Sequence, residues 1–204
     1  MIVYTCITND YDNLKEPRVI TPGWEYICYS DAQQKSDVWE TIITDRPQRE
    51  VKILGNDYNE RVLYVDGSIQ IIGDLDKFLM AIGKTFSLWR HPVRDCIFQE
   101  AEAVIEIKGL NKEVVYRQML KYNDMPRHWG LGQTGVLYRD FGDEDVQRLS
   151  IRWWNEVRDG VTRDQLSLTW CAWKLGMRPH FVPESIIDRY FLLYPHNTSV
   201  WGQL

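Results

Sequence analysis

Apolar residues recur along the chain at two spacings, and these spacings predict its elements. Short apolar runs that end in turn residues are typical of buried strands, whereas apolar residues three and four positions apart, as at Leu75, Phe78, Leu79 and Ile82, are typical of helices. We expect strands at residues 2–7, 25–29, 39–44, 61–65, 86–90, 130–139 and 181–183, with a further extended segment at 68–72. We expect helices at residues 46–54, 75–83, 95–107, 111–122 and 143–157, another helix that begins at 162 or 163, and an irregular tail at 190–204.

The order of these elements predicts the fold class. Strands that alternate with helices through the first half of a chain indicate an α/β fold, with a central, mostly parallel mixed sheet flanked by helices. The length of 204 residues suits a single domain. We find no repeat, low-complexity tract or linker that would divide the chain.

Composition and charge narrow the class of protein. The net charge is −5 and basic residues are interspersed with acidic ones, so the basic stripe typical of nucleic-acid binding is missing. No apolar run approaches the roughly 20 residues that span a bilayer, and the first residues do not resemble a signal peptide. Four scattered cysteines without metal-ligand spacing indicate reduced thiols. We therefore expect a cytoplasmic protein that binds no nucleic acid and has no membrane span.

The most informative pattern is the apolar run 62–65, which ends at Asp66. A carboxylate at the end of a buried strand is costly to desolvate unless it is paired or bound to a metal. In α/β sheets this strand end is where ligands bind. A carboxylate oxygen there suits Mn²⁺ or Mg²⁺ on a diphosphate.

Residues 64–68, Tyr-Val-Asp-Gly-Ser, and 73–75, Gly-Asp-Leu, resemble the Asp-x-Asp region of nucleotide-sugar glycosyltransferases of the GT-A fold, including glycogenin-like members. The family's second metal-binding Asp is replaced here by Ser68, and a hydroxyl is a weaker ligand than a carboxylate. Asp74 and Asp76 form a second Asp-x-Asp string. They stand at the start of an expected helix, where Asp also serves as an N-cap or interacts with the helix dipole.

A small, uncharacterised family of glycosyltransferase-like proteins is more similar still. The similarity covers four segments in order: Asp-Tyr-Asp-Asn-Leu-Lys at 10–15, Asp-Gly-Ser at 66–68, His-Pro-Val-Arg-Asp at 91–95 and Arg-Asp-Gln-Leu-Ser at 163–167. The Asp-Gln pair of retaining GT-A enzymes lies beside the donor sugar, which implies catalytic roles for Asp164 and Gln165. An N-cap role for Asp164 is the simpler alternative.

The same resemblance suggests which residues bind the donor. Thr5, Asn9 and Tyr11, in and after the first strand, would hold the base and ribose, although turn chemistry alone also favours Asn at such a place. Arg49 and Lys52, one helical turn apart, would face the diphosphate or would simply form a solvated helix face.

Three further residues have two interpretations each. Arg94 and Asp95 are either donor-sugar ligands or members of a structural ion pair. His196 is either a late metal ligand beside Asp66 and Ser68, as in related enzymes, or an exposed histidine of the tail.

These observations predict a metal-dependent glycosyltransferase with a GT-A-like, Rossmann-related domain over residues 1–204, whose nucleotide-binding part is about 1–90 and whose acceptor and catalytic part is about 91–204. It would move a sugar from a nucleoside-diphosphate sugar, UDP-sugar first, to a hydroxyl of a glycan or another acceptor. Two alternatives remain at this point: a sugar nucleotidyltransferase, and a catalytically silent nucleotide- or carbohydrate-binding module of the same fold.

Overall fold

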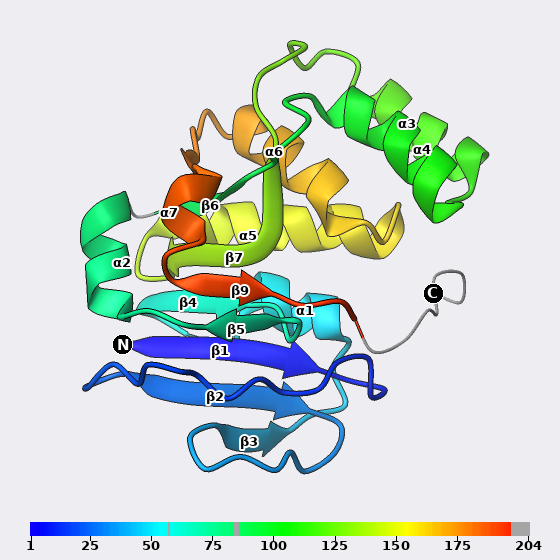
Figure 1. Cartoon of the computed structure of the whole chain (residues 1–204). Helices are drawn as coiled ribbons and strands as arrows, with labels where there is room; N and C mark the ends of the chain where they lie inside the picture. The colour runs from blue at the N-terminus through cyan, green and yellow to red at the C-terminus, as the bar shows by residue number, and fades with distance from the viewer. Residues whose placement is uncertain (57, 84–85, 197–204) are drawn as a thin grey trace.

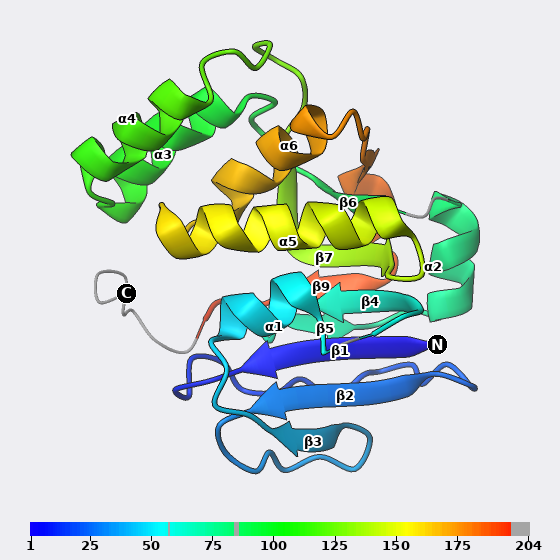
Figure 2. The same cartoon turned by 180° about the vertical axis from the view of Figure 1, so that it is seen from behind.

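The computed structural model describes residues 1–56, 58–83 and 86–196. Within these ranges the chain forms a central sheet with helices on both faces (Figures 1 and 2). The seven strands of the described sheet lie in the order β3 (Glu40–Ile43), β2 (Glu25–Ser30), β1 (Ile2–Ile7), β4 (Arg61–Val65), β7 (Gly132–Asp140), β6 (Phe86–Arg90) and β8 (His180–Val182).

The sheet is mixed but mostly parallel, as predicted. β1 runs parallel to both β2 and β4, β2 is parallel to β3, and β6 is parallel to β8. β7 lies between β4 and β6 and is antiparallel to both. A separate pair, β5 (Ile69–Ile71) and β9 (Phe191–Leu193), is antiparallel and lies in front of the sheet in Figure 1.

The helices divide between the two faces of the sheet. They are α1 (Gln48–Leu54), α2 (Leu75–Ile82), α3 (Ile97–Lys108), α4 (Lys112–Lys121), α5 (Glu144–Asp159), α6 (Asp164–Lys174) and α7 (Glu184–Ile187). Figure 2 shows α1 and α5 over one face, whereas α2 and α7 lie toward the other, and α3 and α4 project together from the upper part.

Strand β4 shows how the sheet separates two cores. Side chains alternate between the faces of a strand, so Val62 and Tyr64 join the core under α1, α5 and α6, while Leu63 and Val65 join the core under α2 and β9. All four side chains are almost completely buried. Strands buried on both faces explain why β1 and β4 read as continuous apolar runs.

The predicted strands and helices form close to their expected positions, with two exceptions. α7 was not expected, and β9 lies within the segment 190–204 that we expected to be irregular. Both are very short, of 4 and 3 residues, so neither contains enough sequence for a periodic pattern. Residues 197–204 of that expected tail lie outside the described residues.

A buried arginine fixes helix α1 on the sheet. Arg139 of β7 is 1% exposed, and its Nη1 donates to the Ile53 carbonyl oxygen at 2.6 Å. Its Nη2 donates to the Lys52 carbonyl oxygen at 2.5 Å and to the Tyr4 hydroxyl at 2.6 Å. These carbonyls belong to the last turn of α1. The carbonyl groups of a last helical turn have no hydrogen-bond partner within the helix and carry partial negative charge. Arg139 therefore satisfies the end of α1 and holds this helix against β1 and β7.

We predict that Arg139→Met lowers the free energy of unfolding by about 1–3 kcal/mol, because the Ile53 carbonyl oxygen loses its side-chain donor while the Lys52 carbonyl keeps only the Tyr4 hydroxyl. Urea unfolding followed by circular dichroism measures the change. Arg61→Met is the matched control: Arg61 pairs with Asp140 across the same strands, but its side chain is 59% exposed. Equal effects of the two substitutions would contradict this role of Arg139.

Candidate functional site

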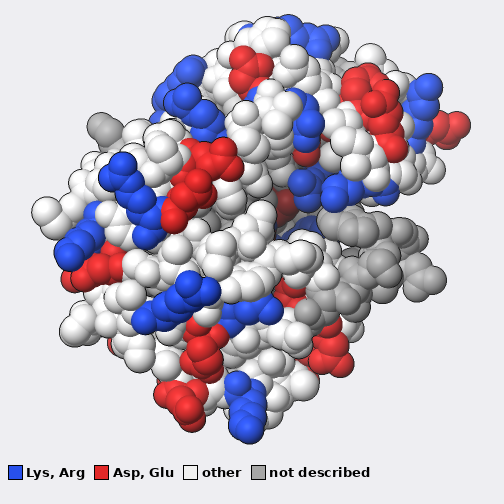
Figure 3. Space-filling model, in the orientation of Figure 1, with Lys and Arg blue, Asp and Glu red and all other residues white. Residues whose placement is uncertain are grey.

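The candidate site lies where the parallel strands β1 and β4 end, between α1 and α6. Lys52 of α1 meets two carboxylates there: its Nζ is 2.8 Å from Asp164 Oδ2 and 3.3 Å from Asp66 Oδ1. Asp66 follows β4 directly, and Asp164 is the first residue of α6. On the face drawn in Figure 3, Lys and Arg atoms gather in the hollow between the lobe of α3 and α4 and the sheet below.

Asp66 is held in place by its neighbours yet stays partly open. Its Oδ1 accepts from the Tyr64 hydroxyl at 2.6 Å as well as from Lys52, and Tyr64 in turn accepts from Gln48 Nε2 at 2.7 Å. Its side chain is 26% exposed, and no described residue bonds its Oδ2. A Cβ at position 135 would lie 3.3 Å from this oxygen, so Gly135 leaves space beside it. Asp66 can therefore present one carboxylate oxygen to a ligand.

Asp164 is more deeply buried, at 5% exposed. Besides Lys52, its Oδ2 accepts from Thr134 Oγ1 at 3.1 Å, and its Oδ1 accepts from the Gln165 backbone N–H at 2.9 Å. Burial alone would raise the pKa of Asp164, but Lys52, Arg49 and Arg163 outweigh it and hold this pKa well below its usual range. A carboxylate this acidic is a poor proton acceptor near neutral pH. It is well suited to stabilising positive charge.

The two predicted phosphate-binding residues of α1 have different surroundings. Lys52 is 4% exposed, and its ammonium group is already shared by Asp66, Asp164 and Thr134. Arg49, one turn earlier, makes no hydrogen bond or ion pair with a described residue, and its charge acts on Asp164 and Tyr11. Lys52 thus organises the carboxylates, while Arg49 is the cation of this helix that is open to an anion.

The loop after β1 turns sharply beside Asp66. Asn9 and Asp10 have φ of 57° and 51°, a left-handed pair typical of type I′ turns, and the Tyr11 N–H donates to the Thr8 carbonyl at 3.2 Å. Asn9 also donates its N–H to Asp31 Oδ2 at 2.8 Å. This turn sends the side chain of Tyr11 toward the charges of Asp66 and Arg49.

Thr5, also predicted to bind the donor, lies in the same region. It is 2% exposed, and its Oγ1 has no hydrogen-bond partner among the described residues. It lines a crevice with Leu14, Trp39 and Asp66 that is too narrow to hold a water molecule. Ligand pockets usually measure about 300–1,000 Å³, so this crevice must widen to admit a nucleotide.

The predicted metal ligands Ser68 and His196 have the following surroundings. His196 Nδ1 lies 2.9 Å from Asp12 Oδ1 and its ring is 4.7 Å from the ring of Tyr11, while Ser68 is 2% exposed. Over residues 1–56, 58–83 and 86–196, no three His, Cys, Asp or Glu side chains are grouped so that they could hold a metal. Mg²⁺ is commonly bound by one or two carboxylates plus substrate phosphates. Asp66 Oδ2 fits a metal that is bound by one carboxylate together with substrate phosphates. The described donors do not fit a metal that is bound by protein atoms alone.

Asp74 and Asp76 serve the structure instead. Asp74 caps α2 by accepting from the Lys77 N–H at 3.0 Å, and Asp76 accepts from Trp24 Nε1 at 2.8 Å. The Asp74 contact matches the N-cap alternative that the sequence left open, whereas Asp76 bonds a side chain of another segment.

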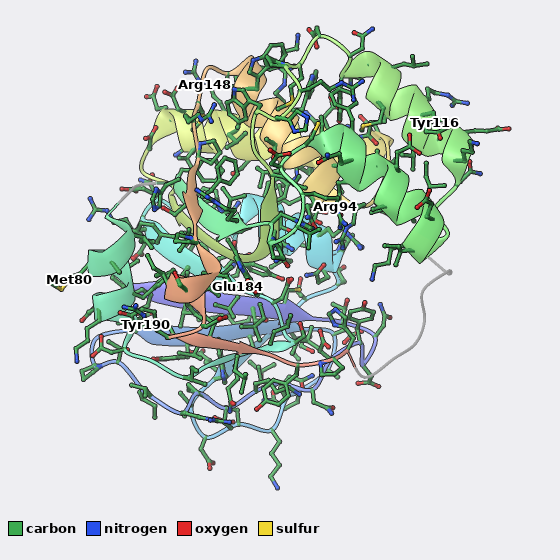
Figure 4. All side chains as sticks on the ribbon, turned by 45° about the horizontal axis from the view of Figure 1, so that its top comes forward. Met80, Arg94, Tyr116, Arg148, Glu184 and Tyr190 are labelled. Atoms are coloured by element: carbon green, nitrogen blue, oxygen red, sulfur yellow. The ribbon has the colours of Figure 1, made fainter. Side chains whose placement is uncertain are left out.

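Arg94 and Asp95 lie in separate ion pairs. Arg94 Nε donates to Glu100 Oε2 at 2.6 Å, and Asp95 Oδ1 lies 2.6 Å from His128 Nδ1 on the surface. In Figure 4, Arg94 lies on the inner side of α3, whereas Tyr116 points outward from α4. Neither Arg94 nor Asp95 contacts Lys52, Asp66 or Asp164, so the ion-pair interpretation describes their observed contacts.

Sequence reasoning missed several residues that build the site. These are Gln48 and Tyr64, which position Asp66, Thr134, which bridges Lys52 and Asp164, and Asp12, which binds His196. Asp12 lies within the segment 10–15 that resembles the family, and Tyr64 lies within the segment 64–68. The resemblance therefore marked both segments, but it did not indicate what these two residues do. Thr134 has no such signal, because its contacts are with Lys52 and Asp164, which lie 82 and 30 positions away in the chain.

One family model and one solved structure are similar to this chain. A model of the family described as "TOD1/MUCI70, glycosyltransferase-like domain" matches residues 59–188, more than half of the chain. No curated protein matches. Among solved structures, the bifunctional glycosyltransferase WbbM in its apo form is similar, with a TM-score of 0.48 and 10% identity over 88% of this chain and 38% of that one. No helix among the described residues is long and apolar enough to cross a membrane.

We predict that Lys52→Met destabilises the protein at pH 7 by about 3–5 kcal/mol, because the buried carboxylate Asp164 and the partly exposed carboxylate Asp66 lose their cation. In the native protein the lowered pKa of Asp164 contributes stability above the unfolded pKa of about 4, which is lost as the pH falls further. In the variant only Arg49 and Arg163 oppose burial, so the pKa of Asp164 is higher than in the native protein and the stability deficit of the variant shrinks as the pH falls toward that pKa.

Urea unfolding of both proteins at pH 7 and pH 4.5 tests this prediction: the deficit of the variant should shrink at the lower pH. Lys174→Met is the control, since Lys174 pairs with Asp124 on the surface. A deficit that stays constant with pH would contradict the proposed role of Lys52.

Proposed function

The chain belongs to the TOD1/MUCI70 glycosyltransferase-like family, and from this premise we propose that it moves a sugar from a nucleoside-diphosphate sugar to a hydroxyl acceptor. The observation that carries the proposal is the Lys52 cluster, in which an open carboxylate, Asp66, and a permanently ionised one, Asp164, meet beside the ends of parallel strands. Ligands of α/β sheets bind at this edge.

In this proposal the loop after β1 binds the nucleoside. Tyr11 would stack on the base, and Thr5 Oγ1 and Asn9 would form hydrogen bonds to the base and ribose. The buried Thr5 Oγ1 without a described partner supports this, because buried polar atoms are normally hydrogen-bonded. A UDP-sugar is the proposed donor and the cytoplasm the proposed compartment.

The diphosphate would lie between Arg49 and Asp66. Arg49 has no described ion-pair partner and can form paired hydrogen bonds with phosphate oxygens. When bound with the donor, Mn²⁺ or Mg²⁺ would supply further positive charge to the leaving diphosphate. Asp66 Oδ2 is the atom of this chain proposed to hold it, oriented by Tyr64 and Gln48.

Asp164 and Gln165 would face the sugar. Because the pKa of Asp164 is low, we propose that it stabilises positive charge that develops on the sugar ring rather than accepting a proton. Gln165 is 3% exposed, and its Nε2 has no partner among the described residues, which leaves a donor for a sugar hydroxyl.

A catalytically silent binding module is the second candidate. The specific observation in its favour is that Lys52 already neutralises part of both carboxylates, while Ser68 stands where the resembling enzymes carry a second metal-binding Asp. This alternative predicts that nucleotide binds without turnover.

We predict that UDP or GDP with Mn²⁺ stabilises the protein and that Asp66→Ala loses the Mn²⁺-dependent part. A ligand at about a hundredfold excess over its Kd adds about 2.7 kcal/mol of stability. Thermal-shift measurements with UDP, GDP, their sugars and Mn²⁺ test this. Asp76→Ala, which removes a surface carboxylate that bonds Trp24, is the control. No stabilisation by any of these nucleotides would overturn the proposed function.

We predict that Asp164→Asn keeps nucleotide binding but lowers turnover by about 10²–10³-fold, because a neutral amide stabilises developing positive charge less well. Release of UDP from UDP-sugars, with and without added oligosaccharide acceptors, measures turnover, and calorimetry measures binding. If the native protein binds nucleotide yet releases none, the silent-module alternative is correct. Equal turnover of native and variant protein would remove Asp164 from the mechanism.

A further inference from the structure

We infer that Arg163 is a second diphosphate-binding cation, paired with Arg49, and that the buried Glu100 cluster positions it. This inference rests on the proposed function and extends it to a residue that the sequence reasoning assigned no role. The Glu100 cluster consists of Glu100, Arg94 and His91 together with Arg163.

The cluster begins with a carboxylate that is 1% exposed. Glu100 Oε2 accepts from Arg94 Nε at 2.6 Å and lies 3.5 Å from His91 Nε2. His91 Nδ1 accepts the backbone N–H of Arg94 at 2.9 Å, and His91 Nε2 lies 3.1 Å from Arg94 Nη2. His91 and Arg94, which precede α3, therefore both contact Glu100 in the first turn of that helix.

Arg163 approaches the other oxygen of the same carboxylate. Its Nη2 is 3.6 Å from Glu100 Oε1 and donates to Gln165 Oε1 at 2.8 Å. Because the short contact with Arg94 already compensates Glu100, the longer one leaves most of the charge of Arg163 available. Its Nε is buried and has no partner among the described residues. Glu100 and Gln165 thus orient Arg163, whose guanidinium group retains hydrogen-bond donors and charge for a ligand.

Arg163 and Arg49 act on the same two groups from different elements. Both lower the pKa of Tyr11, against the larger raising effect of burial, and both lower the pKa of Asp164. Arg49 belongs to α1, whereas Arg163 immediately precedes α6, an 11-residue helix whose N-terminus adds partial positive charge. Geometry agrees with this, because Lys52, one turn after Arg49 in α1, contacts Asp164, which directly follows Arg163, so α1 and the N-terminus of α6 meet at Asp164.

The balance of charge gives Arg163 a role beside the metal ion. Lys52 and Arg49 together only balance Asp66 and Asp164, so without Arg163 a diphosphate entering this space would meet net positive charge only from the metal ion and the N-terminus of α6. Lys52 is also committed to both carboxylates. A second guanidinium supplies the missing charge, and its planar donors match phosphate oxygens.

The experiment compares Arg163→Gln with the native protein in the binding of UDP and GDP against uridine and guanosine, by calorimetry with Mn²⁺ present. We expect Arg163→Gln to weaken diphosphate binding about 10–100-fold, the usual effect of removing a charged hydrogen bond, while nucleoside binding is unchanged. Arg163→Lys keeps the positive charge but not the paired donors of the guanidinium group. Its affinity for the diphosphate should therefore lie between those of the native protein and Arg163→Gln. Arg158→Gln is the control, because Arg158 pairs with Asp159 on the surface.

Glu100→Gln tests the positioning role. It should weaken UDP binding in the native background and have no further effect in the Arg163→Gln background, since coupled residues are not additive. Equal losses for UDP and uridine, or unchanged UDP binding in Arg163→Gln, would overturn the inference and leave the proposed function intact. Failure of the native protein to bind any of the four ligands would overturn the proposed function as well.

Discussion

The buried ammonium group of Lys52 is the constraint on which the site depends. At 4% exposed it cannot rely on water, so carboxylates from elsewhere in the chain must surround it. Asp66 comes from the end of β4, Asp164 from the start of α6, and Thr134 from β7. Satisfying one cation therefore requires four elements to meet at one point, which is also the ligand-binding edge of the sheet.

Two other buried charges support this arrangement from outside it. Arg139 binds the last carbonyls of α1 and so sets the position from which Lys52 and Arg49 project. Glu100 links α3 to Arg163 at the start of α6. The Arg139 side chain reaches from β7 to carbonyl groups of α1, and the Glu100 side chain reaches from α3 to Arg163. Polar contacts as well as the apolar cores therefore specify the positions of α1 and α6.

The sequence predicted more of the fold than of the site. The spacing of apolar residues located the strands of the central sheet and six helices. Burial of one or both faces of an element requires apolar residues at regular positions, and this regularity is visible in the sequence. Asp66 and Asp164 were found from their context, and the structure places them on one lysine. The roles predicted for Lys52 at the diphosphate and for His196 at a metal stay predictions, while the structure shows Lys52 bonded to both carboxylates and His196 bonded to Asp12. Such pairings join residues far apart in the chain and leave no periodic signal.

The sequence by itself determined the α/β class, the carboxylate at the end of β4 and the family, since these depend on local patterns and short ordered segments. Only the tertiary structure decided which cation meets which anion: Lys52 with Asp66 and Asp164, Arg94 and Arg163 with Glu100, and Arg139 with the end of α1. The physical reason is that a charge is costly to bury alone. Its partner is therefore chosen by which groups the packed layers bring within a few ångströms, and the linear order of residues does not contain that distance.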